Sequence, residues 1–222
     1  MPDTRAVFFW MGGVVTQAIE PLLSQALAVC GHPGMNLLAR PGFAEVCADL
    51  ALGRRAGLDF CGDICALAGA DCPAEELDAA LISAFAPAAG VINTIDRLPP
   101  VYQRWLIVDI PREWYEPICE RLCIQPAFPE GQVIFLPESG LPRLLPDVFD
   151  FLAARAQLRM DQCLVLDRSS HRAVAALDHG FPSAIFVDAR RLAREFVLRQ
   201  FTARVPLEHR PATVIQPPSH HP

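Results

Sequence analysis

After Pro87 the sequence alternates short apolar runs with longer amphipathic segments, and this alternation limits the fold more than any other feature. The runs have no helical spacing, whereas the segments between them carry apolar residues every three or four positions. A further run, AVFFW, lies far upstream and stops before Gly12-Gly13. We therefore expect one parallel sheet covered by helices on both faces. The expected strands span residues 6–10, 105–110, 132–136, 162–167 and 183–188, and the helices 90–98, 112–122, 145–158, 171–180 and 189–201.

A helix-rich segment separates the first strand from the others. Four stretches there have apolar residues three or four positions apart, with breaks that contain glycine or proline. Pro73, followed by Glu75 and Glu76, is typical of a helix start. The sequence thus predicts an α/β fold, a Rossmann-like doubly wound parallel five-stranded sheet with a small α-helical cap. Residues 1–15 and 88–200 form the core, 16–87 the cap and 201–222 a proline-rich C-terminal tail.

Composition excludes several functions. The formal net charge is -6 and basic residues do not cluster, so we expect no nucleic-acid partner and no membrane surface. No apolar stretch is long enough for a bilayer span. The N-terminal residues do not have the pattern of a signal peptide, so we expect a cytoplasmic protein. All 19 basic residues are arginine, which excludes a lysine amine from any mechanism. The hydrophobic content of 52% and the tail favour a protein partner or a homo-oligomer.

The eight cysteines are scattered and form no CxxC motif, so neither a zinc knuckle nor a thioredoxin-type site is indicated. The closest pairs along the chain, Cys61/Cys65 and Cys119/Cys123, are four residues apart in segments with helical spacing. We expect buried free thiols rather than disulfides.

The carboxyl ends of parallel strands form the ligand crevice of such sheets. Trp10, Asp109 and the pair Asp167-Arg168 stand at these ends, together with the loop after Leu136. A tryptophan is unexpected where a sheet usually presents a polar catalytic group. Its indole either stacks on a base or a sugar or fills a disused pocket, and we favour the second because aromatic side chains at strand ends more often pack than bind.

Three segments carry a resemblance to a known family: AVFFWMGGVVT, the stretch around WLIVDI, and the stretch from LPESGLPRLL to QCLVLDRSS. Over about residues 5–200 the chain resembles the haloacid dehalogenase-like hydrolases, in the branch with a small helical cap after the first strand. The resemblance implies an aspartate nucleophile, at the position of Trp10, and a second acid two residues later, at the position of Gly12. It implies a Ser or Thr at the position of Asp109 and a phosphate-binding Lys or Arg at the position of Arg143. It also implies acids that hold Mg²⁺, at the positions of Asp167 and Arg168.

In this chain, the first three of these positions hold residues that cannot perform the role that the resemblance implies. The indole carbon of Trp10 has no lone pair with which to attack phosphorus or carbon. Gly12 has no side chain to protonate a leaving group. Asp109 replaces a hydroxyl donor with an acceptor that repels an incoming phosphate at neutral pH.

The remaining family positions keep a positive charge but not the metal site. Arg143 can still bind an oxyanion in place of the lysine. Arg168 stands where a second acid is common, and we expect its guanidinium to repel Mg²⁺ and to pair with Asp167. With Asp109, these residues form either an anion-binding site, with Arg143 and Arg168 as the anion ligands, or an ion-pair network, which we favour because unpaired buried charge is costly.

The sequence therefore predicts a protein with no intact catalytic residue, no cofactor and no metal, which acts as a binding, regulatory or structural protein. The alternative is a weakly active hydrolase of a small phosphorylated metabolite. It would use water activated by Asp109 or Asp167, a clamp at Arg143, and Mg²⁺, with Asp167 as the residue to hold it.

Other candidate residues have simpler interpretations. Ser169, Ser170 and His171 are adjacent at a helix start and cannot form a triad, so one serine is expected to cap the helix, and His171 and His179 to lie on its surface. The pair Arg54-Arg55 after Gly53 either contacts substrate from the cap or is solvated, and we favour solvation. The tail histidines are taken as solvated rather than as metal ligands; they are His209, His220 and His221.

Overall fold

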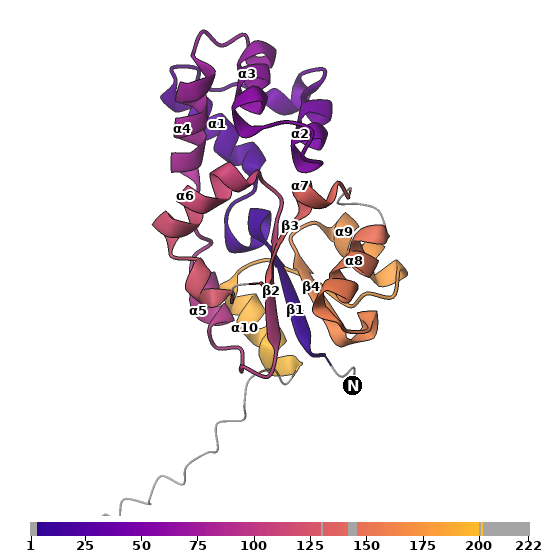
Figure 1. Ribbon diagram of the computed structural model, residues 1–222. Helices are drawn as coiled ribbons and strands as arrows, with labels where there is room; N and C mark the ends of the chain where they lie inside the picture. The colour runs from indigo at the N-terminus through magenta and orange to yellow at the C-terminus, as the bar shows by residue number, and fades with distance from the viewer. Residues whose placement is uncertain (1–3, 130, 142–145, 200, 202–222) are drawn as a thin grey trace, which may run out of the picture.

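The computed structural model describes residues 4–129, 131–141, 146–199 and 201. Its centre is a parallel five-stranded sheet with the strand order β3-β2-β1-β4-β5 (Figure 1). The strands are β1 (Ala6–Trp10), β2 (Gln103–Val108), β3 (Val133–Phe135), β4 (Cys163–Asp167) and β5 (Ser183–Ile185). The predicted fold class is therefore confirmed.

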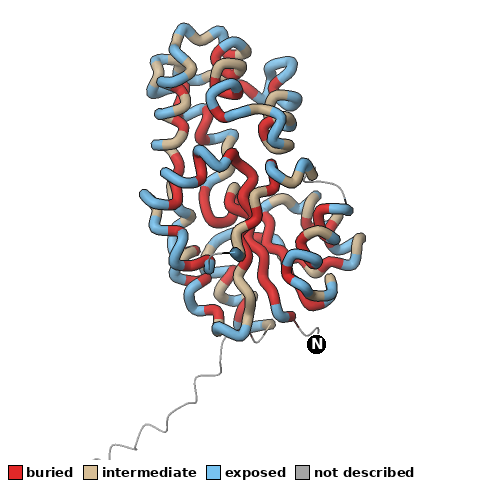
Figure 2. Tube along the Cα trace, viewed as in Figure 1, coloured by how far each residue is buried: buried red, intermediate tan, exposed pale blue. Residues whose placement is uncertain are grey.

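Helices cover both faces of the sheet. In Figure 1, α5, α6 and α10 lie on one side of the sheet and α8 and α9 on the other. The core helices are α5 (Val91–Ile95), α6 (Arg112–Leu122), α7 (Leu136–Ser139), α8 (Asp147–Ala156), α9 (Ser170–Asp178) and α10 (Ala189–Leu198), with short 3-10 turns η3 (Gln125–Ala127) and η4 (Met160–Gln162). Every residue of β1 and β4 is buried, as the red central tubes of Figure 2 show. Burial on both faces explains why these strands are continuous apolar runs.

Four further helices lie beyond the carboxyl ends of the strands and form the cap (Figure 1). They are α1 (Ile19–Val29), α2 (Phe43–Ala51), α3 (Gly57–Ala68) and α4 (Ala74–Ala84), with the 3-10 turn η2 (Leu37–Ala39). The chain enters and leaves this segment at one point, because Thr16 pairs with Pro87 and the Ala88 amide donates to the Val15 carbonyl at 2.8 Å. The extent of the cap, residues 16–87, stays a prediction from the sequence.

Helix α6 ties the cap to the sheet. The Trp114 indole nitrogen donates to Asp78 Oδ1 of α4 at 2.6 Å, and the Gly57 amide donates to Glu113 Oε1 at 3.0 Å. A Cβ at Gly57 would collide with the Trp114 indole, so only glycine permits this approach. Arg121 donates to the carbonyls of Ile82 and Phe85 at the end of the cap segment.

The structure departs from the expected bounds most clearly at β2, β3 and β5. β2 spans Gln103–Val108, so it begins and ends two residues before the expected limits of 105 and 110. β3 stops at Phe135 because Pro137, which has no amide hydrogen for the ladder, opens the short helix α7. β5 ends at Ile185, three residues before the expected limit. The segment η1 (Met11–Val15) directly after β1 is an irregular turn, because Gly12 and Gly13 within it have non-helical backbone angles. Among the described residues, no helix is long and apolar enough to cross a membrane.

Candidate functional site

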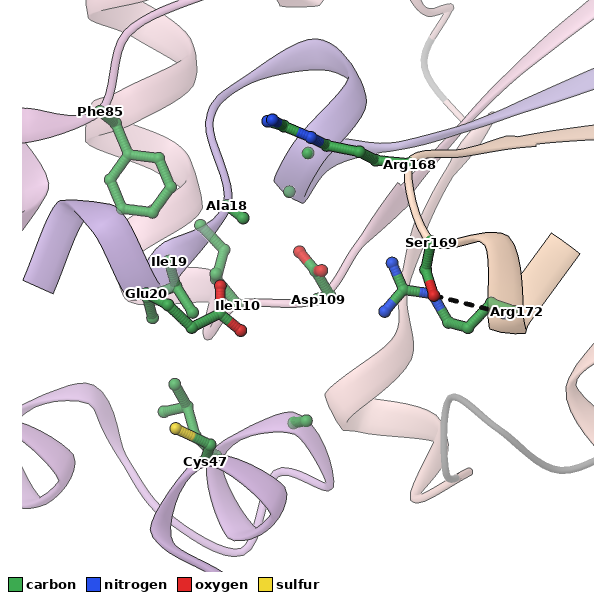
Figure 3. A pocket seen from close by; sticks show the side chains of 14 residues that line it. Ala18, Ile19, Glu20, Cys47, Phe85, Asp109, Ile110, Arg168, Ser169 and Arg172 are labelled. Carbon is green, nitrogen blue, oxygen red and sulfur yellow. Dashed lines mark hydrogen bonds between the residues drawn. The ribbon is translucent and has the colours of Figure 1, made fainter. Parts of the chain in front are cut away.

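A cavity of about 260 Å³ lies between the carboxyl ends of the strands and the cap (Figure 3). The core supplies one aspartate and two arginines to the lining, and the cap supplies an apolar wall and one glutamate. The lining residues are Gly12, Gly13, Ala18, Ile19, Glu20, Cys47, Leu50, Ala51, Phe85, Asp109, Ile110, Arg168, Ser169 and Arg172. The cavity is thus at the place where the sequence predicts a ligand crevice.

The turn η1 brings backbone to the edge of this cavity. The Thr16 amide and hydroxyl both donate to the Met11 carbonyl, at 2.8 and 3.0 Å, and the Gly13 amide donates to the Thr16 carbonyl at 2.9 Å. Gly13 has φ 93°, a conformation that glycine adopts without the cost of a Cβ. The chain therefore bends sharply after β1, and Gly12 and Gly13 line the cavity.

Asp109 directly follows β2, and its side chain points into the cavity (Figure 3). The residue is 5% exposed. A Cβ built on Gly12 would lie 3.0 Å from Asp109 Oδ2 and 3.2 Å from Oδ1. The carboxylate of Asp109 therefore fills the space that a side chain at position 12 would need. The two departures from the family pattern, glycine at 12 and aspartate at 109, depend on each other.

This packing predicts an energetic coupling between the two positions. Gly12 has φ -73° and ψ 117°, which alanine also adopts, so only the contact with Asp109 opposes a Gly12→Ala substitution. We expect Gly12→Ala to lower the free energy of unfolding by about 1–2 kcal/mol in the wild-type background. In an Asp109→Ser background the loss falls to nearly zero. Urea denaturation of the four proteins of the double-mutant cycle measures the difference, and equal losses in both backgrounds would contradict it.

Asp167, at the end of β4, is 1% exposed, and both of its carboxylate oxygens accept hydrogen bonds. Arg172 donates to it through two nitrogens, Nε to Oδ2 at 2.5 Å and Nη2 to Oδ1 at 2.7 Å. The Ser169 amide donates to Oδ1 at 2.8 Å. The Ser169 hydroxyl in turn accepts from the Arg172 amide at 3.3 Å and caps α9, as predicted for one of the two serines (Figure 3).

The expected ion pair between Asp167 and Arg168 is wrong. Arg168 is exposed, lines the cavity, and makes no hydrogen bond or ion pair among the residues that the structure describes. Successive side chains of an extended segment point in opposite directions, so Arg168 turns away from the carboxylate that precedes it. Arg172, in the first turn of α9, reaches back to Asp167 instead.

Trp10 lies beneath the site rather than inside it. Its side chain is 1% exposed and is absent from the cavity wall, and the Arg172 guanidinium carbon lies 5.2 Å from the centre of an indole ring. The indole therefore packs in the core, behind Arg172. This placement contradicts a stacking platform for a ligand, and the open cavity shows that the indole does not fill the crevice either.

Comparison with known proteins identifies the fold. Neither the family models nor the curated protein sequences give a match. Among solved structures, a HAD-family enzyme from Bacteroides thetaiotaomicron is 14% identical with a TM-score of 0.68, over 87% of this chain and 98% of that chain. A HAD-like family hydrolase from Porphyromonas gingivalis is 17% identical with a TM-score of 0.63, over 89% of this chain and 98% of that chain. The chain has the haloacid dehalogenase-like fold.

A third similar structure is the L-2-haloacid dehalogenase from Xanthobacter autotrophicus with chloropropionic acid covalently bound, at 16% identity and a TM-score of 0.64, over 90% of this chain and 85% of that chain. At such identities the likeness shows the haloacid dehalogenase-like fold alone. The activity has to be argued from the residues of the cavity.

The haloacid dehalogenase-like fold implies a Mg²⁺ ion near Asp167, and the residues present do not fit one. Mg²⁺ needs carboxylate oxygens and waters in near-octahedral geometry. Both oxygens of Asp167 accept hydrogen bonds from the Arg172 guanidinium, and the position of the usual nucleophile holds an indole. Within the described part of the chain, no three His, Cys, Asp or Glu side chains are grouped to hold a metal ion. The guanidinium supplies the positive charge on Asp167 that a metal would supply.

The other predicted residues either lie outside the described part of the chain or do not line the cavity. Arg143 lies outside the described residues, as do the three tail histidines. Arg54 and Arg55 pair within the cap, with Asp49 at 3.5 Å and with Asp63 at 2.5 Å, and neither lines the cavity.

The histidine in α9 and the histidine that directly follows this helix also lie away from the cavity wall. His171 is exposed, and His179 is half-buried with Nε2 at 3.2 Å from Asp150 Oδ2.

Sequence reasoning missed several residues that line the cavity, among them Arg172, Glu20 and Phe85. Arg172 had a usable signal, an arginine in the first turn of the helix that follows Asp167. Glu20 and Phe85 belong to the cap, and nothing in their local sequence marks them as lining the cavity.

Proposed function

We propose that this chain binds a small organic anion in the cavity under the cap and does not hydrolyse it. The observation that carries the proposal is the engagement of Asp167 by Arg172. A carboxylate that forms two charge-assisted hydrogen bonds with a guanidinium is not available to a metal ion. With Trp10 buried at the nucleophile position, the wall has no side chain there that could form a covalent intermediate.

One charged group of the cavity supports an anionic group on the ligand. Arg168 is a cavity guanidinium with no protein acceptor among the described residues, so it is available to a carboxylate or a phosphate. Asp109 and Glu20 are acceptors on the same wall and favour a ligand that also carries hydroxyl or amino donors. Phe85 and Leu50 provide apolar surface for its carbon skeleton. The volume of about 260 Å³ suits a small metabolite rather than a polymer.

An activity assay tests the absence of hydrolysis. The wild-type protein is incubated with Mg²⁺ and a panel of phosphate esters and 2-haloacids, and Mg²⁺ is titrated by calorimetry. We expect no turnover above a mock preparation and no saturable heat.

The weak hydrolase remains the second candidate, and one observation favours it: Asp109 is a buried carboxylate that points into the cavity. Turnover that disappears in Asp109→Asn, but persists in the exposed control Arg155→Ala, would support the hydrolase and refute the binding protein.

The binding proposal predicts a role for Arg168. Thermal-shift screening of small carboxylates and phosphates is expected to yield ligands that stabilise the wild-type protein. Arg168→Ala is expected to weaken their binding at least about tenfold, because it removes a charge-assisted contact. Arg155→Ala, which removes an exposed arginine of α8 away from the cavity, leaves the affinity unchanged. Equal affinities in all three proteins would show that the ligands bind elsewhere.

Partners and location stay predictions from composition. Exposed apolar side chains near β5 and on α10 would suit self-association or a protein partner; they are Ile185, Val187, Val197 and Leu198. A cytoplasmic location likewise stays a prediction.

A further inference from the structure

Three cysteines from different segments of the cap converge. Cys30 ends α1, Cys65 lies in the last turn of α3, and Cys72 lies just before α4. The sulfur atoms of Cys65 and Cys72 are 3.3 Å apart. Burial and, after it, the nearby Cys72 thiol raise the pKa of Cys30. The cluster is separate from the cavity, because none of the three residues lines it.

The backbone brings Cys72 back to Cys65. Helix α3 ends at Gly69, which has φ 65°, a conformation that favours glycine. The Gly69 amide donates to the Ala66 carbonyl, and the Ala70 amide donates to the Cys65 carbonyl at 2.9 Å. This reversal explains why a pair separated by seven residues meets.

We propose that Cys65 and Cys72 form a reversible disulfide when the protein meets hydrogen peroxide. A disulfide has a sulfur–sulfur bond of about 2.05 Å, so the two sulfurs need to approach by only about 1.3 Å. Cys72 is half-buried and Cys65 is 7% exposed, so peroxide reaches Cys72 first and Cys65 acts as the resolving thiol. The modification links the end of α3 to the start of α4 inside the cap.

The reaction balances with one peroxide molecule. The Cys72 thiolate attacks one peroxide oxygen, the O–O bond breaks, and the hydroxide released takes up a proton to become water. The Cys65 sulfur then attacks the resulting sulfenic sulfur of Cys72, and a second water leaves with the proton of Cys65. The two sulfurs are oxidised by two electrons in total, and the two peroxide oxygens are reduced.

The environment of the pair makes disulfide closure depend on pH. Burial, followed by the interaction with Cys72, raises the pKa of Cys65 to about 12, and burial raises that of Cys30 to about 11. Only the thiolate attacks a sulfenic sulfur, so Cys65 reacts slowly at neutral pH. Below the raised pKa the thiolate fraction of Cys65 grows as pH increases. Disulfide closure is therefore expected to accelerate from pH 7 to pH 9.

Peptide mapping tests the pairing in the full-length protein. After peroxide treatment and blocking of free thiols, cleavage before aspartate separates the cysteines, because Asp63, Asp71 and Asp78 flank them. The expected product is peptide 63–70 linked to peptide 71–77, and reduction releases both. A link between peptide 71–77 and the peptide that holds Cys30 would overturn the pairing, as would the persistence of both free thiols.

Cysteine variants test whether the disulfide forms because the two sulfurs are close together or only because a thiol is exposed. Cys65→Ser and Cys72→Ser each abolish the linked peptide, whereas Cys30→Ser and Cys123→Ser retain it. Cys123 is exposed and its sulfur contacts the Glu120 carbonyl, so it controls for oxidation by accessibility alone. Circular dichroism establishes that each variant is folded. A linked peptide that survives Cys65→Ser would refute the proposal.

Discussion

Replacing Trp10 with alanine is expected to lower the free energy of unfolding by about 3–5 kcal/mol. The indole is 1% exposed in the central strand of the sheet, so truncation leaves a large cavity that the neighbouring strands cannot close. Guanidinium denaturation measures the loss. Trp10→Phe keeps most of the buried apolar volume and serves as the control, with an expected loss of about 1–2 kcal/mol. A loss below about 1 kcal/mol for Trp10→Ala would contradict a packing role.

The same placement predicts that the family nucleophile cannot simply be restored. Trp10→Asp removes the indole and adds a buried carboxylate beside the Asp167–Arg172 pair, so it is expected to destabilise the protein more than Trp10→Ala does. We expect no turnover with Mg²⁺ and phosphate esters from this variant. Turnover by a folded Trp10→Asp protein would show that one substitution separates this chain from a catalyst.

The second large effect is expected at Asp167. Asp167→Ala leaves the Arg172 guanidinium partly buried without its carboxylate and is expected to cost about 3 kcal/mol. Combining Asp167→Ala with Arg172→Ala costs less than the sum of the two single substitutions, with a coupling energy of about 2 kcal/mol. Urea denaturation of the four proteins of the cycle measures this coupling.

The chain offers a matched control for that cycle. Arg159 and Asp161 form the same two-nitrogen geometry, with both distances at 2.9 Å, but their side chains are 71% and 61% exposed. Solvent screens the exposed pair, so its coupling energy is expected to be at or below about 0.5 kcal/mol. Similar coupling energies for the two pairs would mean that burial does not strengthen the contact of Asp167 with Arg172.

Much of the fold follows from local sequence. The apolar run 6–10 and the helix 112–122 are found within the predicted bounds, because apolar spacing is a local signal. The presence of an indole at the end of β1 also follows from the sequence, since it needs only the identity of one residue at a strand end. The direction of a side chain does not follow in this way: Arg168 and Arg172 are both near Asp167 in sequence, and only the start of α9 decides which of them pairs with it.

Contacts between distant segments account for the rest. The packing of the Asp109 carboxylate against Gly12 depends on the register between β1 and β2, in which Trp10 lies opposite Ile107. The meeting of Cys65 and Cys72 depends on the turn at Gly69. The contribution of Phe85 to the cavity depends on the position of the cap relative to the sheet. Helix α6 fixes that position through contacts with residues far away in the sequence.

The cation that neutralises Asp167 is part of the polypeptide. A bound metal is lost by dilution or to a chelator, and its stabilising effect scales with the free ion concentration. A guanidinium on α9 is present at a fixed ratio of one per chain under every condition. The melting temperature of this protein should therefore be the same in EDTA as in millimolar magnesium.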